Sequence, residues 1–257
     1  METPTKLDMW SLTLSKRDLE AAPEDERLFH LMAGQLANEL NILTKTILIA
    51  HNGVVGHEVQ MRAHLAQTLY FVRVLAARLH QGWELIQKAY HPLHPHYNAG
   101  LTDKGRDALK AIKKHFGQTN IVSVVRNKMA AHADPETFRK AFAALPVDAD
   151  LVDYFGEDRG HCLYFSAEFL TLVAMIELTG APDWQTALDK ALNETIALAG
   201  TMGDFVLEAM AVFVNRNLRH LSFEPFQVEA GPPIDKAQLP FFAARPTDGW
   251  MGGAPQT

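Results

Sequence analysis

The segment RNKMAAHAD, residues 126–134, gathers an arginine, an asparagine, a lysine and a histidine whose chemistry suits a phosphodiester. Metal-free cleavage of RNA needs a group of near-neutral pKa to move protons at the 2′-hydroxyl and at the leaving 5′-oxygen, and histidine has such a pKa. It also needs a cation that donates hydrogen bonds to the phosphate as charge builds, which a guanidinium does well. Arg126 and His132 are therefore candidate catalytic residues. Asn127 is a candidate for holding the phosphate or orienting His132, and Lys128 for binding RNA.

The spacing of Arg126 and His132 is not evidence by itself. The chain contains two Arg–His pairs with four to six intervening residues, Arg73/His80 and Arg126/His132. A random order of the same residues would contain about as many. Arg73 lies inside a long expected helix, where surface arginines are common. Arg126 is followed directly by Asn127, so its context differs.

His132 is expected in the last turn of a helix, because Pro135 ends the helix within a few residues. The negative end of the helix dipole raises the pKa of a histidine there. Positions six apart in an ideal α-helix are separated by about 240° of rotation, so Arg126 and His132 share a substrate only through distortion or a second subunit. The alternative is that His132 continues the apolar stripe of Ile121, Val125 and Met129 as a packed helix-end residue.

Helical periodicity dominates the chain. The expected helices cover 24–51, 57–90, 102–116, 119–132, 135–145, 166–179 and 183–219. The first has an apolar seam through Leu28, Met32, Leu36, Leu40 and Ile47, and the second has seam residues alternating three and four apart, which favours near-antiparallel packing. LVDYF and HCLYF flank the turn GEDRG and are typical of strands. The sequence therefore predicts an all-α antiparallel bundle with two or three long helices and a small β-hairpin at about 151–165.

Composition divides the chain into three parts. An N-terminal segment, 1–23, precedes a single helical domain over 24–221, and 222–257 forms an extended tail that holds six of the 13 prolines. We expect the LPFF segment of this tail to pack on the bundle.

Charge and cysteine content narrow the class of protein. A net charge of −6 provides no general positive field, so contact with RNA requires a local basic patch. A single cysteine excludes an intrachain disulfide and a cysteine-cluster metal site, which suits a reducing cytoplasm. The N-terminus lacks signal-peptide features, and the apolar runs are shorter than the roughly 18–20 residues of a membrane span. Phosphate-binding loops, GxSxG and HExxH motifs are absent from the sequence.

A basic patch is expected on the helix 102–116, which places Arg106, Lys110, Lys113 and Lys114 on one side. Such runs are mostly solvated faces, but here they are also candidates for RNA binding. Glu39 lies at the edge of the first helix's seam, so we expect it to pair with Arg126 or Lys128, either structurally or to orient the site.

The segment HPLHPHYNAG is expected to break the second helix. Its histidines, His91, His94 and His96, are close enough to consider a metal site, but no neighbouring acid or cysteine completes one. We therefore expect an exposed turn, no metal and no cofactor.

VVRNKMAAH, preceded upstream by the apolar helix QLANELNIL, resembles the HEPN superfamily of all-helical proteins. The resemblance covers about residues 24–145. Members that cleave RNA carry an Arg, commonly followed by Asn, and a His four to six residues later, which match Arg126, Asn127 and His132. Some members also present an acidic residue from an earlier helix, to which Glu39 could correspond.

The resemblance implies a dimer in which two motifs line one cleft, and it implies metal-independent RNA cleavage. A toxin or defence protein with an antitoxin-like partner is one form of this prediction. A non-catalytic binding or scaffold protein of the same fold is the first alternative, since some members only bind. A bundle that binds a nucleotide or small molecule in the same basic pocket is the second.

Overall fold

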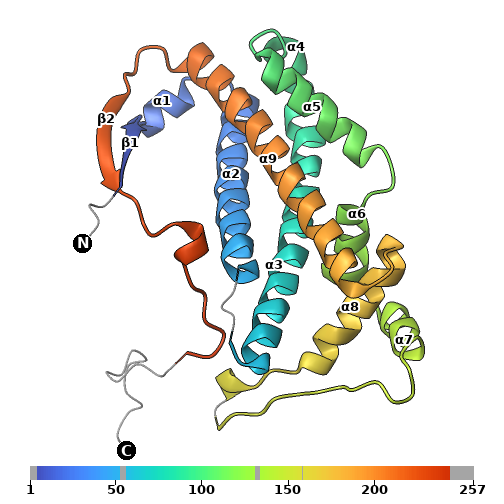
Figure 1. Ribbon diagram of the computed structural model, residues 1–257. Coiled ribbons are helices and arrows are strands. Elements are labelled where there is room, and N and C mark those ends of the chain that lie inside the picture. The colour runs from blue at the N-terminus through green and yellow to red at the C-terminus, as the bar shows by residue number, and fades with distance from the viewer. Residues whose placement is uncertain (1–4, 53–55, 131–133, 158, 244–257) are drawn as a thin grey trace, which may run out of the picture.

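The computed structural model describes residues 5–52, 56–130, 134–157 and 159–243. Three long helices form its centre: α2 (Glu24–His51), α3 (Glu58–Leu85) and α9 (Trp184–Asn217). They lie side by side, with α9 running obliquely across the other two (Figure 1). An all-α bundle built around long helices is therefore confirmed.

Local sequence explains where these helices begin. The first turn of α2 contains Glu24, Asp25 and Glu26, whose charges favour the positive end of the helix dipole. The ring of His57 caps α3 by accepting from the amide of Val59, and Asp183 caps α9 through the amide of Thr186.

The apolar seam of α2 lies one position away from the expected one at its N-terminal end. Leu36, Leu40 and Ile47 are buried as predicted, but Phe29 and Ala33 fill the core where Leu28 and Met32 were expected. Leu28 and Met32 are about half exposed instead, at 47% and 51%.

Glycine allows the closest approach among the three central helices. A Cβ atom at Gly82 of α3 would lie 2.4 Å from Sδ of Met202 and 2.9 Å from a methyl group of Leu36. Both distances are shorter than real contacts, so a larger residue would require the side chains of Met202 and Leu36 to move. Within the described residues, α9 is the one helix long and apolar enough to span a membrane, and 44% of its most apolar window is buried in this bundle.

A buried ionic cluster joins the start of α2 to the end of α9. The carboxylate of Glu26, 4% exposed, accepts hydrogen bonds from Arg216 at 3.0 Å, from Asn217 at 2.8 Å and from the hydroxyl of Tyr97 at 3.1 Å. Burial raises the pKa of Glu26, but these donors outweigh burial and hold the pKa below its ordinary value. The cluster therefore fixes the end of the bundle opposite to the start of α9.

Shorter elements surround the three central helices. They are α1 (Lys16–Glu20), α4 (His94–Tyr97), α5 (Asp103–Phe116), α6 (Ile121–Val125), α7 (Pro135–Ala143) and α8 (Phe165–Thr179). The expected break after α3 is softer than predicted: a π-helical turn, Ile86–Tyr90, and a 3₁₀ turn, His91–Leu93, lead into α4. The prolines lie at the first positions of these turns, where no helical hydrogen bond is lost.

The two-stranded sheet joins the two ends of the described chain. β1 (Lys6–Ser11) pairs antiparallel with β2 (Glu224–Glu229), in a register that runs from Lys6 opposite Glu229 to Ser11 opposite Glu224. The N-terminal segment and the tail, which was expected to be extended, are thus tied to each other.

The segment 151–165 forms a single antiparallel bridge, Tyr154–Leu163, in place of the predicted hairpin. Pairing stops there because the carboxylate of Asp153 accepts from the amide of Ser166 and so binds the start of α8. The guanidinium of Arg62 lies over the rings of Tyr154 and Phe165 and holds this segment against α3. Phe241 and Phe242 pack against the same place, as expected for LPFF.

Candidate functional site

The candidate site is built on a change of helix type within the motif. α6 continues directly into η3 (Arg126–Ala130), a π-helical turn whose hydrogen bonds close on the fifth residue and which therefore holds more residues per turn. The rotation of about 240° assumed an α-helix and does not apply to these residues. His132 lies outside the described residues.

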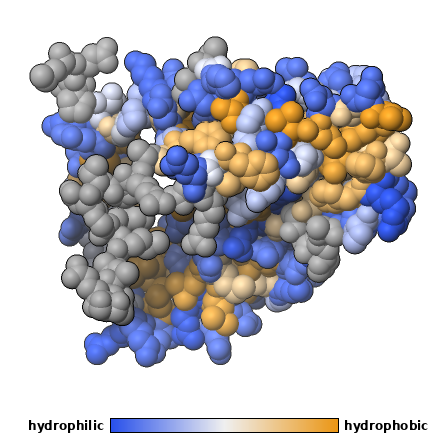
Figure 2. Space-filling model, turned by 90° about the horizontal axis from the view of Figure 1, so that it is seen from below, coloured by the Kyte–Doolittle hydropathy of each residue, from blue (hydrophilic) through white to orange (hydrophobic). Residues whose placement is uncertain are grey.

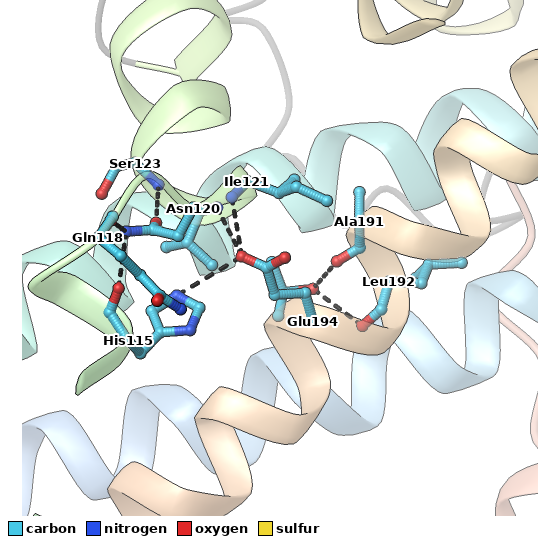
Figure 3. Close-up of polar contacts among 10 residues, drawn as sticks. His115, Gln118, Asn120, Ile121, Ser123, Ala191, Leu192 and Glu194 are labelled. Atoms are coloured by element: carbon cyan, nitrogen blue, oxygen red, sulfur yellow. Dashed lines mark hydrogen bonds and ion pairs between the residues drawn. The ribbon is translucent and has the colours of Figure 1, made fainter. Parts of the chain in front are cut away.

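A carboxylate from α9 anchors the start of α6 (Figure 3). One oxygen of Glu194 accepts from the amide of Ile121 at 2.8 Å and of Val122 at 3.4 Å, and lies 3.5 Å from Nε2 of His115. Asn120 is the N-cap of α6: its side-chain oxygen Oδ1 accepts a hydrogen bond from the amide of Ser123 at 2.7 Å. These contacts fix the helical segment that leads to Arg126.

The described residues of the motif form local contacts. The guanidinium of Arg126, half-buried, donates to Oδ1 of the exposed Asn127 at 2.7 Å. Nζ of Lys128 lies 2.9 Å from the carboxylate of Asp134, the N-cap of α7, and this hydrogen bond raises the pKa of Lys128. Arg126 and Asn127 are thus held as a unit, while Lys128 is partly neutralised.

A groove of about 420 Å³ lies along α3 beside η3. Six residues at helical spacing on α3 line the groove: Tyr70, Arg73, Val74, Ala77, Arg78 and Gln81. Met129 of the motif also lines it. Two arginines and an exposed tyrosine are side chains that bind and stack on single-stranded nucleic acid. The sequence contained one signal that could have revealed this groove, namely the polar face of α3 with Arg73, Arg78 and Gln81.

Glu39 borders this groove but does not contact the motif. Its carboxylate lies 3.5 Å from Nε of Arg78, so the predicted pairing with Arg126 or Lys128 was wrong. The reason is geometric: α2 and η3 each pack against α3 far more than against each other, so Glu39 meets Arg78 of α3. Arg73 is also paired, with Glu168 of α8 at 3.2 Å, so both arginines of the groove are held in place.

His80, on α3, is the neighbour of Arg126 that the sequence did not single out. Burial lowers the pKa of His80, the positive charge of Arg126 lowers it further, and Glu84 opposes them. The pKa of Glu84 is in turn lowered by its hydrogen bond from Lys88 and by the charges of Lys88, His80 and Arg126. Arg126 of η3 and Glu84 of α3 therefore act on the pKa of His80 in opposite directions.

The basic patch on α5 is smaller than expected. Arg106 donates to the carbonyls of Leu101 and Asn98 and pairs with Asp103, so it stabilises the start of its own helix. The exposed lysines of this patch have no ion pair among the described residues: Lys110, Lys113 and Lys114. The last turn of α5 reaches α3, where the rings of Phe116 and Trp83 stack at 5.3 Å, near His80.

Within the described parts of the chain, no group of three or more His, Cys, Asp or Glu side chains could hold a metal ion. His91 and His96 are exposed, and the ring of His94 lies against Tyr90. A separate cavity of about 640 Å³ lies between the end of α2 and the starts of α3, α8 and α9. The candidate residues of the motif and of α5 do not line it.

Comparison of the chain with protein families, with curated proteins and with solved structures found no match.

Proposed function

We propose that this protein is a HEPN-like endoribonuclease that cleaves RNA without a metal ion and acts as a homodimer. Arg126 and His132 are its catalytic residues: the guanidinium stabilises the charge that builds on the phosphate, and the imidazole transfers a proton. Asn127 binds the phosphate or orients His132.

The observation that carries the proposal is the position of the Arg126–Asn127 pair beside the groove on α3. The pair is preformed by a hydrogen bond of 2.7 Å, and the adjoining groove holds Arg73, Arg78 and Tyr70. Tyr70 and the guanidinium planes of Arg73 and Arg78 offer a stacking surface for the neighbouring nucleotides, although Glu168 and Glu39 partly neutralise the charge of the two arginines. Glu39 acts here as a positioning acid, because it holds Arg78.

Three lysines of α5 supply the local positive charge that an acidic protein needs to hold RNA. Lys110, Lys113 and Lys114 share one face at i, i+3 and i+4, although Asp107 lies one turn before them. Lys128 and Arg106 contribute less, since each is engaged by a carboxylate.

The exposed side of α2 supports dimerisation. Four apolar side chains of α2 are about half exposed or more, from 47% to 64%: Leu28, Leu31, Met32 and Ile42. Glu39, which pairs with Arg78, is on the same helix. Apolar residues gathered on one helix face are typical of an interface. A dimer through this face, acting in the cytoplasm and controlled by a protein partner of the antitoxin kind, completes the proposal.

Cleavage of varied RNAs in the presence of EDTA tests this proposal. We expect cleavage by the wild type, loss by at least about 100-fold in Arg126→Ala and in His132→Ala, and a dimer in sedimentation. Arg139→Ala is the matched control, because its exposed pair with Glu136 contributes little to stability. Thermal unfolding shows whether each variant is folded. If the wild type leaves RNA intact with and without candidate partners, the proposal is wrong.

A non-catalytic binding protein is the second candidate, and a surface observation favours it. The lower face of the molecule, which carries the connection between α7 and α8, shows hydrophobic areas among hydrophilic ones (Figure 2). Exposed hydrophobic residues at the end of α7 and along this connection to α8 include Phe142, Val147, Phe155 and Tyr164. This candidate predicts a stable protein complex that Phe155→Ser disrupts and Arg126→Ala leaves unchanged.

A further inference from the structure

The cavity between the end of α2 and the starts of α3, α8 and α9 has an apolar interior. Its volume of about 640 Å³ lies within the roughly 300–1,000 Å³ of sites that bind small molecules. Thr68 is the polar residue among the buried ones that line it, and its hydroxyl is satisfied because it donates to the carbonyl of His64 at 2.9 Å. The other buried lining residues are apolar: Ala50, Phe165, Leu172 and Leu188. The interior therefore suits the apolar body of a ligand.

Three aromatic side chains line the cavity. Phe165 and Phe169 of α8 have ring centroids 6.4 Å apart, and Trp184 is the first residue of α9. The guanidinium of Arg62 lies 5.1 Å from the centroid of the Phe165 ring. Within the described parts of the chain, the rings of Phe169 and Trp184 have no cation over them. The cavity thus has aromatic surface on which a further cation can lie.

The charged side chains that line the cavity are two carboxylates and one guanidinium. Glu58 and Arg62 form an ion pair and neutralise each other. Asp189, which is exposed, has no ion pair among the residues that the structure describes. Lys190 follows it in sequence but does not line the cavity. With the imidazole of His51 uncharged, one carboxylate is left to attract a positive group.

The helix ends at the cavity also favour a cation over an anion. Glu58 already lies in the first turn of α3. The carboxylate of Asp153 accepts from the amide of Ser166 at the start of α8. The carboxylate of Asp183 accepts from the amide of Thr186 at the start of α9. An anionic ligand would compete with a carboxylate at each of these helix starts, whereas the end of α2 presents the negative end of its dipole.

We propose that this cavity binds a small organic cation, namely an amine with an apolar body. The body lies in the interior, against Leu172 and Leu188. The ammonium group lies near Asp189 and the ring of Trp184, which line the cavity from the first two turns of α9. The inference does not rest on the proposed function, because the residues of the motif do not line this cavity.

Calorimetric titration of the full chain with three probes that share one body tests this proposal: phenylbutylamine, phenylbutanol and phenylbutyrate. We expect the amine to bind as one equivalent per chain and about 10-fold more tightly than the alcohol, because its charge meets a carboxylate and an aromatic ring. Phenylbutyrate should bind less tightly than the alcohol. The proposal is overturned if the amine does not bind, if it binds no more tightly than the alcohol, or if phenylbutyrate binds best.

Two variants locate the amine in the cavity, and thermal unfolding shows that each is folded. Asp189→Asn should weaken binding of the amine about 3–5-fold and leave that of the alcohol unchanged. Its control is Asp107→Asn, which removes an exposed carboxylate from α5 outside the cavity and should change neither. Trp184→Ala should weaken binding of both probes about 5-fold, whereas Trp10→Ala, which removes an exposed tryptophan from β1, should not. Wild-type affinity for the amine in Asp189→Asn or in Trp184→Ala overturns the assignment of the site.

Discussion

The carboxylate of Glu194 joins the central bundle to the candidate site, so its removal links stability to function. In Glu194→Ala, the amides of Ile121 and Val122 lose their acceptor on α9. A hydrogen bond to a charged group contributes about 1.5–3 kcal/mol and loss of a helix cap costs about 0.5–2 kcal/mol. The bond at 2.8 Å dominates, because the contact at 3.4 Å is long. We expect the free energy of unfolding to fall by about 2 kcal/mol.

Urea unfolding and thermal unfolding measure this effect. For a chain of this size, a loss of about 2 kcal/mol lowers Tm by roughly 4–8 °C. Glu194→Gln keeps an acceptor oxygen without the charge and should lose about half as much. Asp189→Ala, which removes an exposed carboxylate from the same helix, is the control and should stay within about 0.5 kcal/mol of the wild type.

Hydrogen exchange gives the local readout of the same change. The amides of Ile121 and Val122 should exchange faster in Glu194→Ala, and the motif that follows should be loosened with them. A Glu194→Ala protein with wild-type stability and unchanged exchange at these two amides would refute the anchoring role of Glu194.

Two further predictions concern ionic contacts. Glu26→Ala should lower the free energy of unfolding in urea by about 1.5–3 kcal/mol, because Tyr97, Asn217 and the partly solvated Arg216 lose their charged acceptor, whereas Glu24→Ala should change it by less than about 0.5 kcal/mol. A loss below about 0.5 kcal/mol in Glu26→Ala contradicts this. Hydrogen bonds from Lys128 and Thr137 lower the pKa of Asp134 to about 2, below its unfolded value of about 3.9, so its stabilisation is present above pH about 4 and is lost as pH falls through about 2. A carboxyl NMR titration should show this midpoint and its rise in Lys128→Met, and a wild-type midpoint near 3.8 contradicts it.

Helix positions were predictable because their signals are local. Periodicity and caps predicted the range 24–51 for α2, which the structure gives as Glu24–His51, and they came within one or two residues for α5, α8 and α9. The helix expected over 57–90 begins within one residue of α3, but α3 ends at Leu85 and a π-helical turn covers Ile86–Tyr90. The seam at the start of α2 was less certain, since Leu28 and Phe29 are both apolar and only the neighbouring helices decide which one is buried.

The sheet could not be predicted, because its strands pair across more than 200 residues. Each strand alternates apolar and polar residues only briefly, at Leu7 and Met9 and at Phe226 and Val228, and the segment 151–165 has better local strand signals than either. Those signals were overridden by Asp153, which binds the start of α8. Local pattern predicts elements, and long-range contacts decide which of them pair.

The candidate site was predictable in its motif but not in its surroundings. Arg126 and Asn127 stand out by residue type and order, whereas the groove on α3 and the proximity of His80 depend on how η3 lies on α3. The pair Arg73/His80 looked like a chance match. The structure gives its members separate places: Arg73 binds Glu168, and His80 lies in reach of Arg126.

The most direct test of the endoribonuclease proposal is the cleavage rate of one defined RNA in EDTA by the wild type and by Arg126→Ala, with the product ends identified by mass spectrometry. The account predicts cleavage by the wild type with 2′,3′-cyclic phosphate and 5′-hydroxyl ends, and a rate at least about 100-fold lower for a folded Arg126→Ala protein. Equal rates for the two proteins, or no cleavage by the wild type, would contradict it.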